Sequence, residues 1–233
     1  MEYEVRYYYP KSDLDKLNKK YIEVNMEYEV RYYFSKNELS NLINKLDNIK
    51  ELTKEKRTYE KTIQYDHPNN DMSFYSKEID GRFRIRISKN EDISKCMISW
   101  KRRLTHTIDV NEEEEVELTL KYEEYDNLLF IINNVLKMKQ IESYERYRTI
   151  YYNEEIEISI DEYPFGIALE IENKSNNKNP KDIVKKWIDI LNLNIEDSYK
   201  LSWDDKYTSL CKEQNIEIYK DVTFDKPMPE VIK

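Results

Sequence analysis

The sequence predicts an α+β fold, a closed eight-stranded antiparallel β-barrel with flanking helices. Three observations lead to this prediction. Many segments alternate polar and apolar residues with a period of two, three segments repeat apolar residues at helical spacing, and the polar positions of the alternating segments are mostly charged. Because successive side chains of a strand point to opposite faces, the alternation predicts strands with one apolar and one charged face.

The alternating segments follow one another along the chain and are separated by polar turns. They are residues 27–33, 57–66, 71–79, 81–88, 94–104, 112–122, 144–152, 154–161 and 166–172. Strands joined by short turns are typical of antiparallel sheet. Three helices are expected beside them. The first has leucines at positions 39, 42 and 46, the second spans 122–138, and the third begins near Pro180.

A tandem repeat divides the chain into three parts. Residues 1–25 and 26–50 open with the same eight residues, MEYEVRYY, and each copy is expected to form a strand and a helix. Two copies are too few for a solenoid, which needs at least three stacked units. We therefore predict a duplicated extension at 1–25, a tunnel domain at 26–215 and a tail at 216–233, which is expected to be loose after Pro227.

Composition excludes several functional classes. The 233 residues include 21 tyrosines and 39% apolar residues, so the chain should fold although 36% of it is charged. Two glycines are too few for a glycine-rich phosphate loop, which leaves side chains to bind any phosphate. The two cysteines predict neither a disulfide framework nor a zinc ribbon. No apolar run approaches about 20 residues, so no membrane span is expected, and a cytoplasmic location fits.

The strand charges are grouped by sign. Glutamates two positions apart lie on one face, about 6.6 Å from each other. Such pairs are Glu27 and Glu29, Glu115 and Glu117, and Glu170 and Glu172; the basic sets are Arg82, Arg84 and Arg86, Lys101 and Arg103, and Arg146 and Arg148. Exposed cross-strand ion pairs are the simpler interpretation. Like charges along one strand favour instead an inward face that binds divalent cations and a polyanion.

In their order these segments resemble the CYTH or triphosphate tunnel metalloenzyme superfamily. Its N-terminal ExExK strand is matched by EYEVR at 27–31, with Arg31 in place of the usual lysine. FRIRIS, SWKRR and EEVEL resemble the strands that follow, and YERYRTIYY and EISIDEYPFGIALEIEN resemble the last basic strand and the final ExE segment. The similarity covers about residues 26–212.

The resemblance implies a site that binds Mg²⁺ or Mn²⁺ together with a triphosphate. The implied metal ligands are Glu27, Glu29, Asp161, Glu170 and Glu172. The implied phosphate-binding residues are Arg84, Arg86, Lys101, Arg146 and Arg148. The implied catalytic residues are Glu27, Glu29, Arg31, Lys101, Glu115 and Glu117. Water is the expected nucleophile, since no serine, cysteine or histidine constellation competes for that role.

The implied reaction is hydrolysis of a triphosphate, with the RNA 5′-triphosphate of mRNA capping ranked first. Inorganic tripolyphosphatase, thiamine triphosphatase and class IV adenylate cyclase are the enzymatic alternatives. A binding module without turnover is the alternative of another class. The copy of the repeat that enters the barrel is expected to be the second, because only it is followed by a helix and then by RTYEKTIQYD. Formation of a homodimer is left open.

Overall fold

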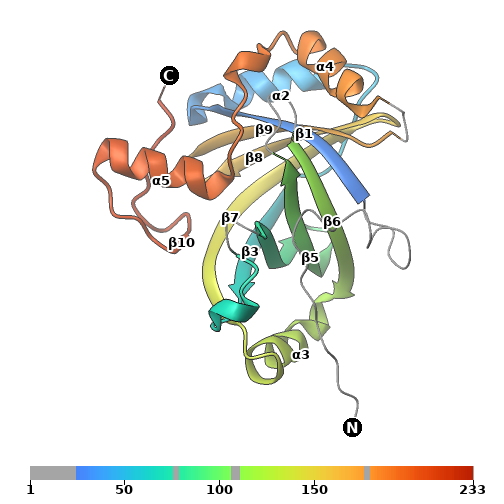
Figure 1. Cartoon of the computed structure of the whole chain (residues 1–233). Helices are drawn as coiled ribbons and strands as arrows, with labels where there is room; N and C mark the ends of the chain where they lie inside the picture. The colour runs from blue at the N-terminus through green and yellow to red at the C-terminus, as the bar shows by residue number, and fades with distance from the viewer. Residues whose placement is uncertain (1–24, 76–78, 106–110, 176–178, 233) are drawn as a thin grey trace.

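The computed structural model describes residues 25–75, 79–105, 111–175 and 179–232. Its ten strands form one sheet, and four α-helices pack against it (Figure 1). The strands are β1 (Asn25–Phe34), β2 (Thr53–Lys54), β3 (Thr58–Asp66), β4 (Gly81–Lys89), β5 (Ser94–Thr105), β6 (Asn111–Lys121), β7 (Lys139–Tyr152), β8 (Ile156–Tyr163), β9 (Gly166–Asn173) and β10 (Asp221–Val222). The helices are α2 (Leu39–Asp47), α3 (Tyr125–Phe130), α4 (Pro180–Ile190) and α5 (Trp203–Gln214).

Eight long strands pair antiparallel in the order β7-β3-β4-β5-β6-β1-β9-β8, and β8 also pairs with β7. Two strands change partners along their length. β1 pairs with β6 over 25–29 and with β9 over 29–34, so only Glu29 is common to both pairings. β7 pairs with β3 over 139–148 and with β8 over 147–152. The expected antiparallel sheet with flanking helices is confirmed, but the sheet curves around its inner face without closing into the regular barrel that we expected.

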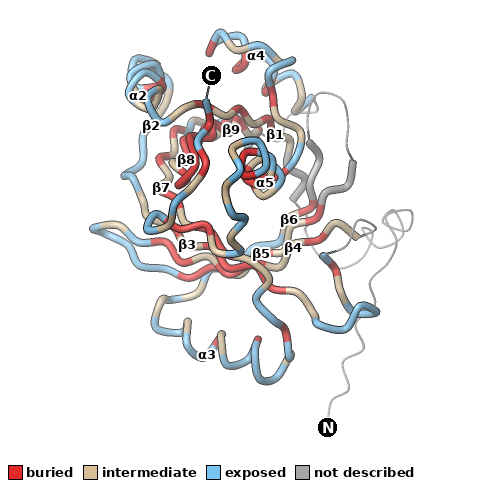
Figure 2. Tube along the Cα trace, turned by 90° about the vertical axis from the view of Figure 1, so that its left-hand side faces the viewer, coloured by how far each residue is buried: buried red, intermediate tan, exposed pale blue. Residues whose placement is uncertain are grey.

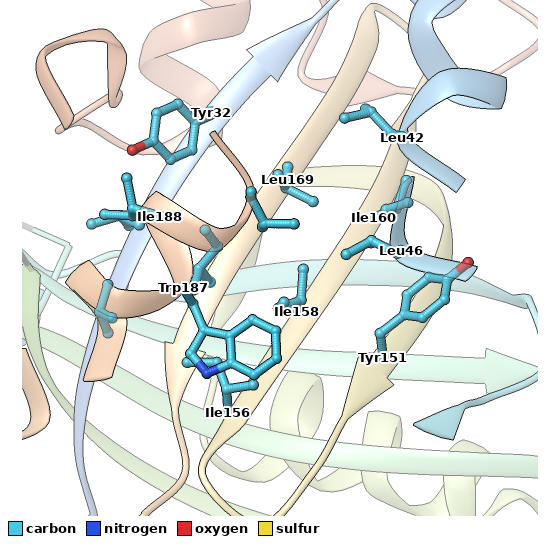
Figure 3. Packing of buried hydrophobic residues seen from close by; sticks show 14 of the residues in the cluster. Tyr32, Leu42, Leu46, Tyr151, Ile156, Ile158, Ile160, Leu169, Trp187 and Ile188 are labelled. Atoms are coloured by element: carbon cyan, nitrogen blue, oxygen red, sulfur yellow. The ribbon is translucent and has the colours of Figure 1, made fainter. Parts of the chain in front are cut away.

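The largest apolar core lies outside the sheet, between β1, β8 and β9 and the helices α2 and α4 (Figures 1 and 3). Ile158, Ile160 and Ile171 project outward from the sheet and are fully buried. Trp187 of α4 belongs to the same core and lies beside Ile158 in Figure 3; it is also fully buried. Because this core takes the apolar faces of these strands, their polar faces are left to line the inside of the curve.

Two further cores pack on the sheet, one on its outer face and one on its inner face. Ile63, Ile85 and Cys96 of β3, β4 and β5 pack with α3 and the turn of π-helix after it, at 131–135. Trp203 and Tyr207 of α5 pack on Tyr163 and Ala168, which share the inner face with Asp161. The solvent side of α3 is exposed, as Figure 2 shows. No described helix has the length and apolar character needed to cross a membrane.

Two local expectations were wrong. Residues 71–79 alternate in polarity, yet 70–72 form a short 3₁₀ helix, because Asp66 accepts hydrogen bonds from Ser73 Oγ at 2.6 Å and from Phe74 N at 3.1 Å and so holds a turn. The tail after Pro227, which the composition suggested was loose, is docked. Val231 is buried and donates its N–H to Phe165 O at 2.9 Å. The first copy of the repeat, at 1–25, lies outside the described residues except for Asn25.

Candidate functional site

The inner face of the curved sheet carries the charged residues that the sequence singled out. Cross-strand partners of an antiparallel pair point to the same face. The register places Arg31 opposite Glu170, Arg148 opposite Asp161, and Lys101 opposite Glu115. Glu29, Arg84, Arg146 and Asp161 are all buried. Ion pairs between strands therefore do form, as the simpler interpretation supposed, but they form inside the molecule.

A buried network joins β3, β7 and β8. Asp161, which is 0% exposed, accepts from Arg148 Nε at 2.6 Å, from Arg148 Nη2 at 2.6 Å and from Arg146 Nη1 at 2.7 Å. Glu60 accepts from Arg146 Nε at 2.8 Å and lies 3.7 Å from Arg86. Burial alone would raise the pKa of the Glu60 carboxyl, but Arg146 and Arg86 hold that pKa well below its usual range. Glu60 is thus ionised, and the hydrogen bonds of both acids fix the arginines in place.

A second network links β1 and β9 to the first. Glu170 accepts from Arg31 Nε at 2.6 Å and from Arg148 Nη2 at 2.7 Å. Burial opposes ionisation of Glu170, yet Arg31 and Arg148 bring its pKa well below the ordinary value. Arg31 also lies 3.3 Å from Glu29. Arg31, which replaces the lysine of the ExExK pattern, therefore bridges Glu29 of β1 and Glu170 of β9.

The metal ligands implied by the resemblance are not equally placed to bind a cation. Glu29 of β1 and Glu172 of β9 are direct cross-strand partners, and such facing carboxylates are unfavourable unless a cation lies near them. Lys101 Nζ lies 3.8 Å from Glu29, and Lys174 Nζ lies 2.6 Å from Glu172. Both carboxylate oxygens of Asp161 accept hydrogen bonds from arginines. The oxygen donors of Glu29 and Glu172 suit Mg²⁺ or Mn²⁺.

The described residues contain no group of three His, Cys, Asp or Glu side chains that could hold a metal ion. The Glu27 side chain lies outside the description, although the backbone of Glu27 pairs with Glu113 in β6. The donor chemistry thus fits a divalent cation at Glu29 and Glu172, with Glu170 beside them and engaged by arginines.

The predicted basic strand residues lie on the inner face of β4, β5 and β7. Arg84 Nη2 lies 3.5 Å from Glu115, and Arg86 Nε donates to Thr62 Oγ1 at 3.4 Å. Lys101, on β5, is mostly buried. The second member of the β6 glutamate pair behaves differently, because Glu117 is exposed while Glu115 is half-buried. The register places Glu117 on the same face, opposite Ser99, so the inner face carries every described residue of the predicted set, although Glu117 reaches solvent.

The arginines leave a positive field even after these ion pairs have formed. Burial should raise the pKa of the Tyr144 hydroxyl, but Arg146, Arg86 and Arg84 lower that pKa to about 8. On the same strand, burial and the nearby Asp204 raise the pKa of Glu142 to about 8. The positive region therefore centres on Arg84, Arg86 and Arg146, and an anion would be stabilised there.

The sequence reasoning missed Glu60, Thr62 and Gln64 of β3. All three are buried, and each lies on the inner face opposite a β4 residue: Ser88, Arg86 and Arg84, respectively. A signal was present, because RTYEKTIQYD has polar residues at every second position from 58 to 66. The segment mixes glutamate with uncharged residues, so a search for like-charged pairs passes over it.

The sequence matches no protein-family model and no curated protein significantly, whereas solved structures resemble the fold. The PH1819 protein of Pyrococcus horikoshii has a TM-score of 0.57 and 23% identity, over 81% of this chain and 99% of its own. The PH1012 protein of that organism has a TM-score of 0.58 and 19% identity, over 76% and 96%.

HpAC1 from Hippeastrum, whose structure is described as revealing a dominant triphosphatase activity, has a TM-score of 0.55 and 15% identity over 83% of this chain and 97% of its own. A candidate adenylate cyclase from Vibrio parahaemolyticus has a TM-score of 0.57 and 15% identity, over 78% and 97%. These identities support a shared fold and leave the substrate open.

Proposed function

We propose, from the premise that the chain has the CYTH-like triphosphate tunnel fold of its structural neighbours, that it is a divalent-metal-dependent triphosphatase. The observation that carries the proposal is the group of Arg84, Arg86 and Arg146, of which Arg84 and Arg146 are buried and Arg86 is half-buried; its field lowers the pKa of the buried Tyr144 to about 8. Burying arginines is costly, and a structure that holds three of them beside a polar inner face is suited to a polyanion.

The inner-face side chains have two roles: the basic ones bind phosphate, and the acidic ones orient the basic ones. Arg86, Arg146 and Lys101 would bind the phosphate oxygens, since guanidinium groups form paired hydrogen bonds with them. Asp161 and Glu60 act through these arginines by fixing their orientation, which keeps the donors in place for the transition state. In the reaction, water attacks the terminal phosphorus and loses a proton, the bond to the bridging oxygen breaks, and that oxygen leaves with the diphosphate product, which frees inorganic phosphate.

Glu29 and Glu172 would hold Mg²⁺ or Mn²⁺, with Glu27 as the third donor expected from the resemblance. When bound, the cation would neutralise phosphate charge and lower the pKa of a water molecule. The RNA 5′-triphosphate end, as in mRNA capping, is the substrate we rank first, ahead of inorganic tripolyphosphate. The triphosphatase activity described for HpAC1 supports hydrolysis over cyclisation.

A substrate panel tests this proposal. Triphosphate-ended RNA, ATP, tripolyphosphate and thiamine triphosphate are incubated with the full chain and Mg²⁺ or Mn²⁺, and released phosphate and pyrophosphate are measured. We expect phosphate from at least one substrate, dependent on the metal. Pyrophosphate with cyclic AMP would indicate a cyclase instead. No product from any substrate, together with tight binding of one of them, would indicate a binding module.

The same assay decides which copy of the repeat contributes the acidic residues. Glu27→Ala with Glu29→Ala should abolish phosphate release, because the Glu29 carboxylate lies between Arg31 and Lys101. Glu2→Ala with Glu4→Ala is the matched control, since the two segments are identical over MEYEVRYY. Loss of activity in the control alone would assign the site to the first copy.

A further inference from the structure

One row of inner-face residues crosses three strands and carries several buried polar atoms that have no hydrogen-bond partner among the described residues. Gln64 of β3 lies opposite Arg84 of β4, and Arg84 lies opposite Ser99 of β5. We call these three residues the Gln64 row. Arg86 of β4 lies two residues from Arg84, on one side of this row. Lys101 of β5 lies two residues from Ser99, on the other side. A ligand that touches both Arg86 and Lys101 therefore passes over Arg84 and Ser99, with Gln64 beside Arg84.

The Gln64 row holds four polar atoms without a partner. Gln64 Nε2, Gln64 Oε1, Arg84 Nε and Ser99 Oγ are buried and have no hydrogen-bond partner among the described residues. Gln64 and Ser99 are each 1% exposed, and Arg84 is 8% exposed. Buried polar atoms in folded proteins are nearly always satisfied, so four such atoms on three adjacent strands require a ligand or ordered water.

The donors and acceptors of the row limit the chemistry of that ligand. Arg84 Nε and Gln64 Nε2 only donate, and the Ser99 hydroxyl can donate, so three of the four atoms suit phosphate oxygens. The fourth atom, the amide oxygen of Gln64, only accepts. Ionised tripolyphosphate offers oxygen acceptors and would leave this amide oxygen unsatisfied. A nucleotide also carries sugar hydroxyls and base N–H groups, which can donate to it.

We propose that the Gln64 row is a specificity subsite, which favours triphosphates bearing an organic group with a hydrogen-bond donor over bare tripolyphosphate. The proposal rests on the triphosphate-binding function above and narrows its substrate class. Gln64 positions the organic group through its amide oxygen, while Arg84 and Ser99 bind the phosphate beside it.

Binding measurements on the full chain test this proposal. Isothermal titration with magnesium compares the non-hydrolysable methylene analogues of ATP and of tripolyphosphate, whose P–CH2–P bridges add no N–H or O–H donor. The wild type should bind the nucleotide analogue more tightly. Gln64→Leu should reduce the ratio of the two affinities about tenfold, because it removes the acceptor that only the nucleotide uses. Ser99→Ala should weaken both analogues by a similar factor, because its hydroxyl would donate to a phosphate oxygen.

A matched control separates the subsite from general effects of losing an amide. Gln140 of β7 is exposed and donates to Asp221 Oδ1 at 2.9 Å. Gln140→Leu should leave both affinities unchanged. Thermal denaturation supplies a second test: Gln64→Leu should not lower the midpoint, because an unpartnered buried amide contributes no hydrogen bond to the free protein. A clear drop in the midpoint would show that the amide has a structural partner and would overturn the proposal.

The outcomes distinguish this inference from the function on which it rests. A wild type that binds neither analogue refutes both. A wild type that binds tripolyphosphate as tightly as the nucleotide refutes only the subsite. An unchanged affinity ratio in the Gln64→Leu variant would also refute only the subsite, because it would mean that ordered water forms the hydrogen bonds of the Gln64 row.

Discussion

Removing the charge of Asp161 should both destabilise the protein and increase the response of its stability to polyanions. The carboxylate is 0% exposed and accepts three hydrogen bonds from Arg146 and Arg148, at 2.6 to 2.7 Å. Asp161→Asn keeps the shape of the side chain but removes the charge that these arginines face. It also puts an amide donor where a guanidinium donor already points.

The size of the effect follows from the burial of this network. Removing one partner of a buried ion pair typically costs about 3–5 kcal/mol of unfolding free energy. For a domain of this length each kcal/mol shifts the melting temperature by about 2–4 °C, so a fall of about 6–20 °C is expected. Tripolyphosphate should restore more stability to the variant than to the wild type, because the variant contains one more uncompensated positive charge.

Thermal denaturation followed by circular dichroism, with and without tripolyphosphate, measures both effects. Glu162→Gln is the matched control. The neighbouring Glu162 pairs with Arg57 at the surface, and such pairs contribute at most about 1 kcal/mol. A loss for Asp161→Asn no larger than that of the control would refute the buried network. An equal or smaller response to tripolyphosphate in the variant would refute the view that the arginines form an anion receptor.

Three further outcomes are expected. Because the folded-state pKa of Glu142 is raised to about 8, the folded state binds the proton more tightly, and stability should fall as pH rises from about 4.5 to 8; Glu142→Gln should remove this dependence in urea denaturation curves. Trp187→Ala should cost about 3–5 kcal/mol in the same assay, because the indole is fully buried in the largest core. Gly81→Ala should also destabilise, by about 1–3 kcal/mol, because its new Cβ would lie 2.3 Å from the Trp100 ring.

The strands were predictable because their outer faces are buried under helices and their inner faces are charged. Ile158 and Ile160 face the helices, and Ser159 and Asp161 between them face inward, which produces the alternation read from the sequence. The same alternation wrongly predicted a strand at 71–79. There, the side chain of Asp66 holds a turn that brings Phe74 against Trp100 at 5.2 Å between ring centroids, and local alternation carries no information about such a contact.

The composition of the site was more predictable than its pairings. Like-charged sets at i, i+2 spacing identified Arg146 and Arg148 and also Glu170. Their partners depend on the register between strands, which places Asp161 opposite Arg148 and thereby commits that carboxylate to arginines. Register follows from the turns and from packing across the sheet, so one chain read alone could not assign Asp161 to this network.

The most direct test of the account is a structure determined with a triphosphate and Mn²⁺. The phosphates should lie on the inner face of the sheet, within hydrogen-bonding distance of Arg86, Arg146 and Lys101, with the metal at Glu29 and Glu172. A triphosphate bound instead on the outer surface, for example in the groove lined by Lys61 and Lys226, would contradict it.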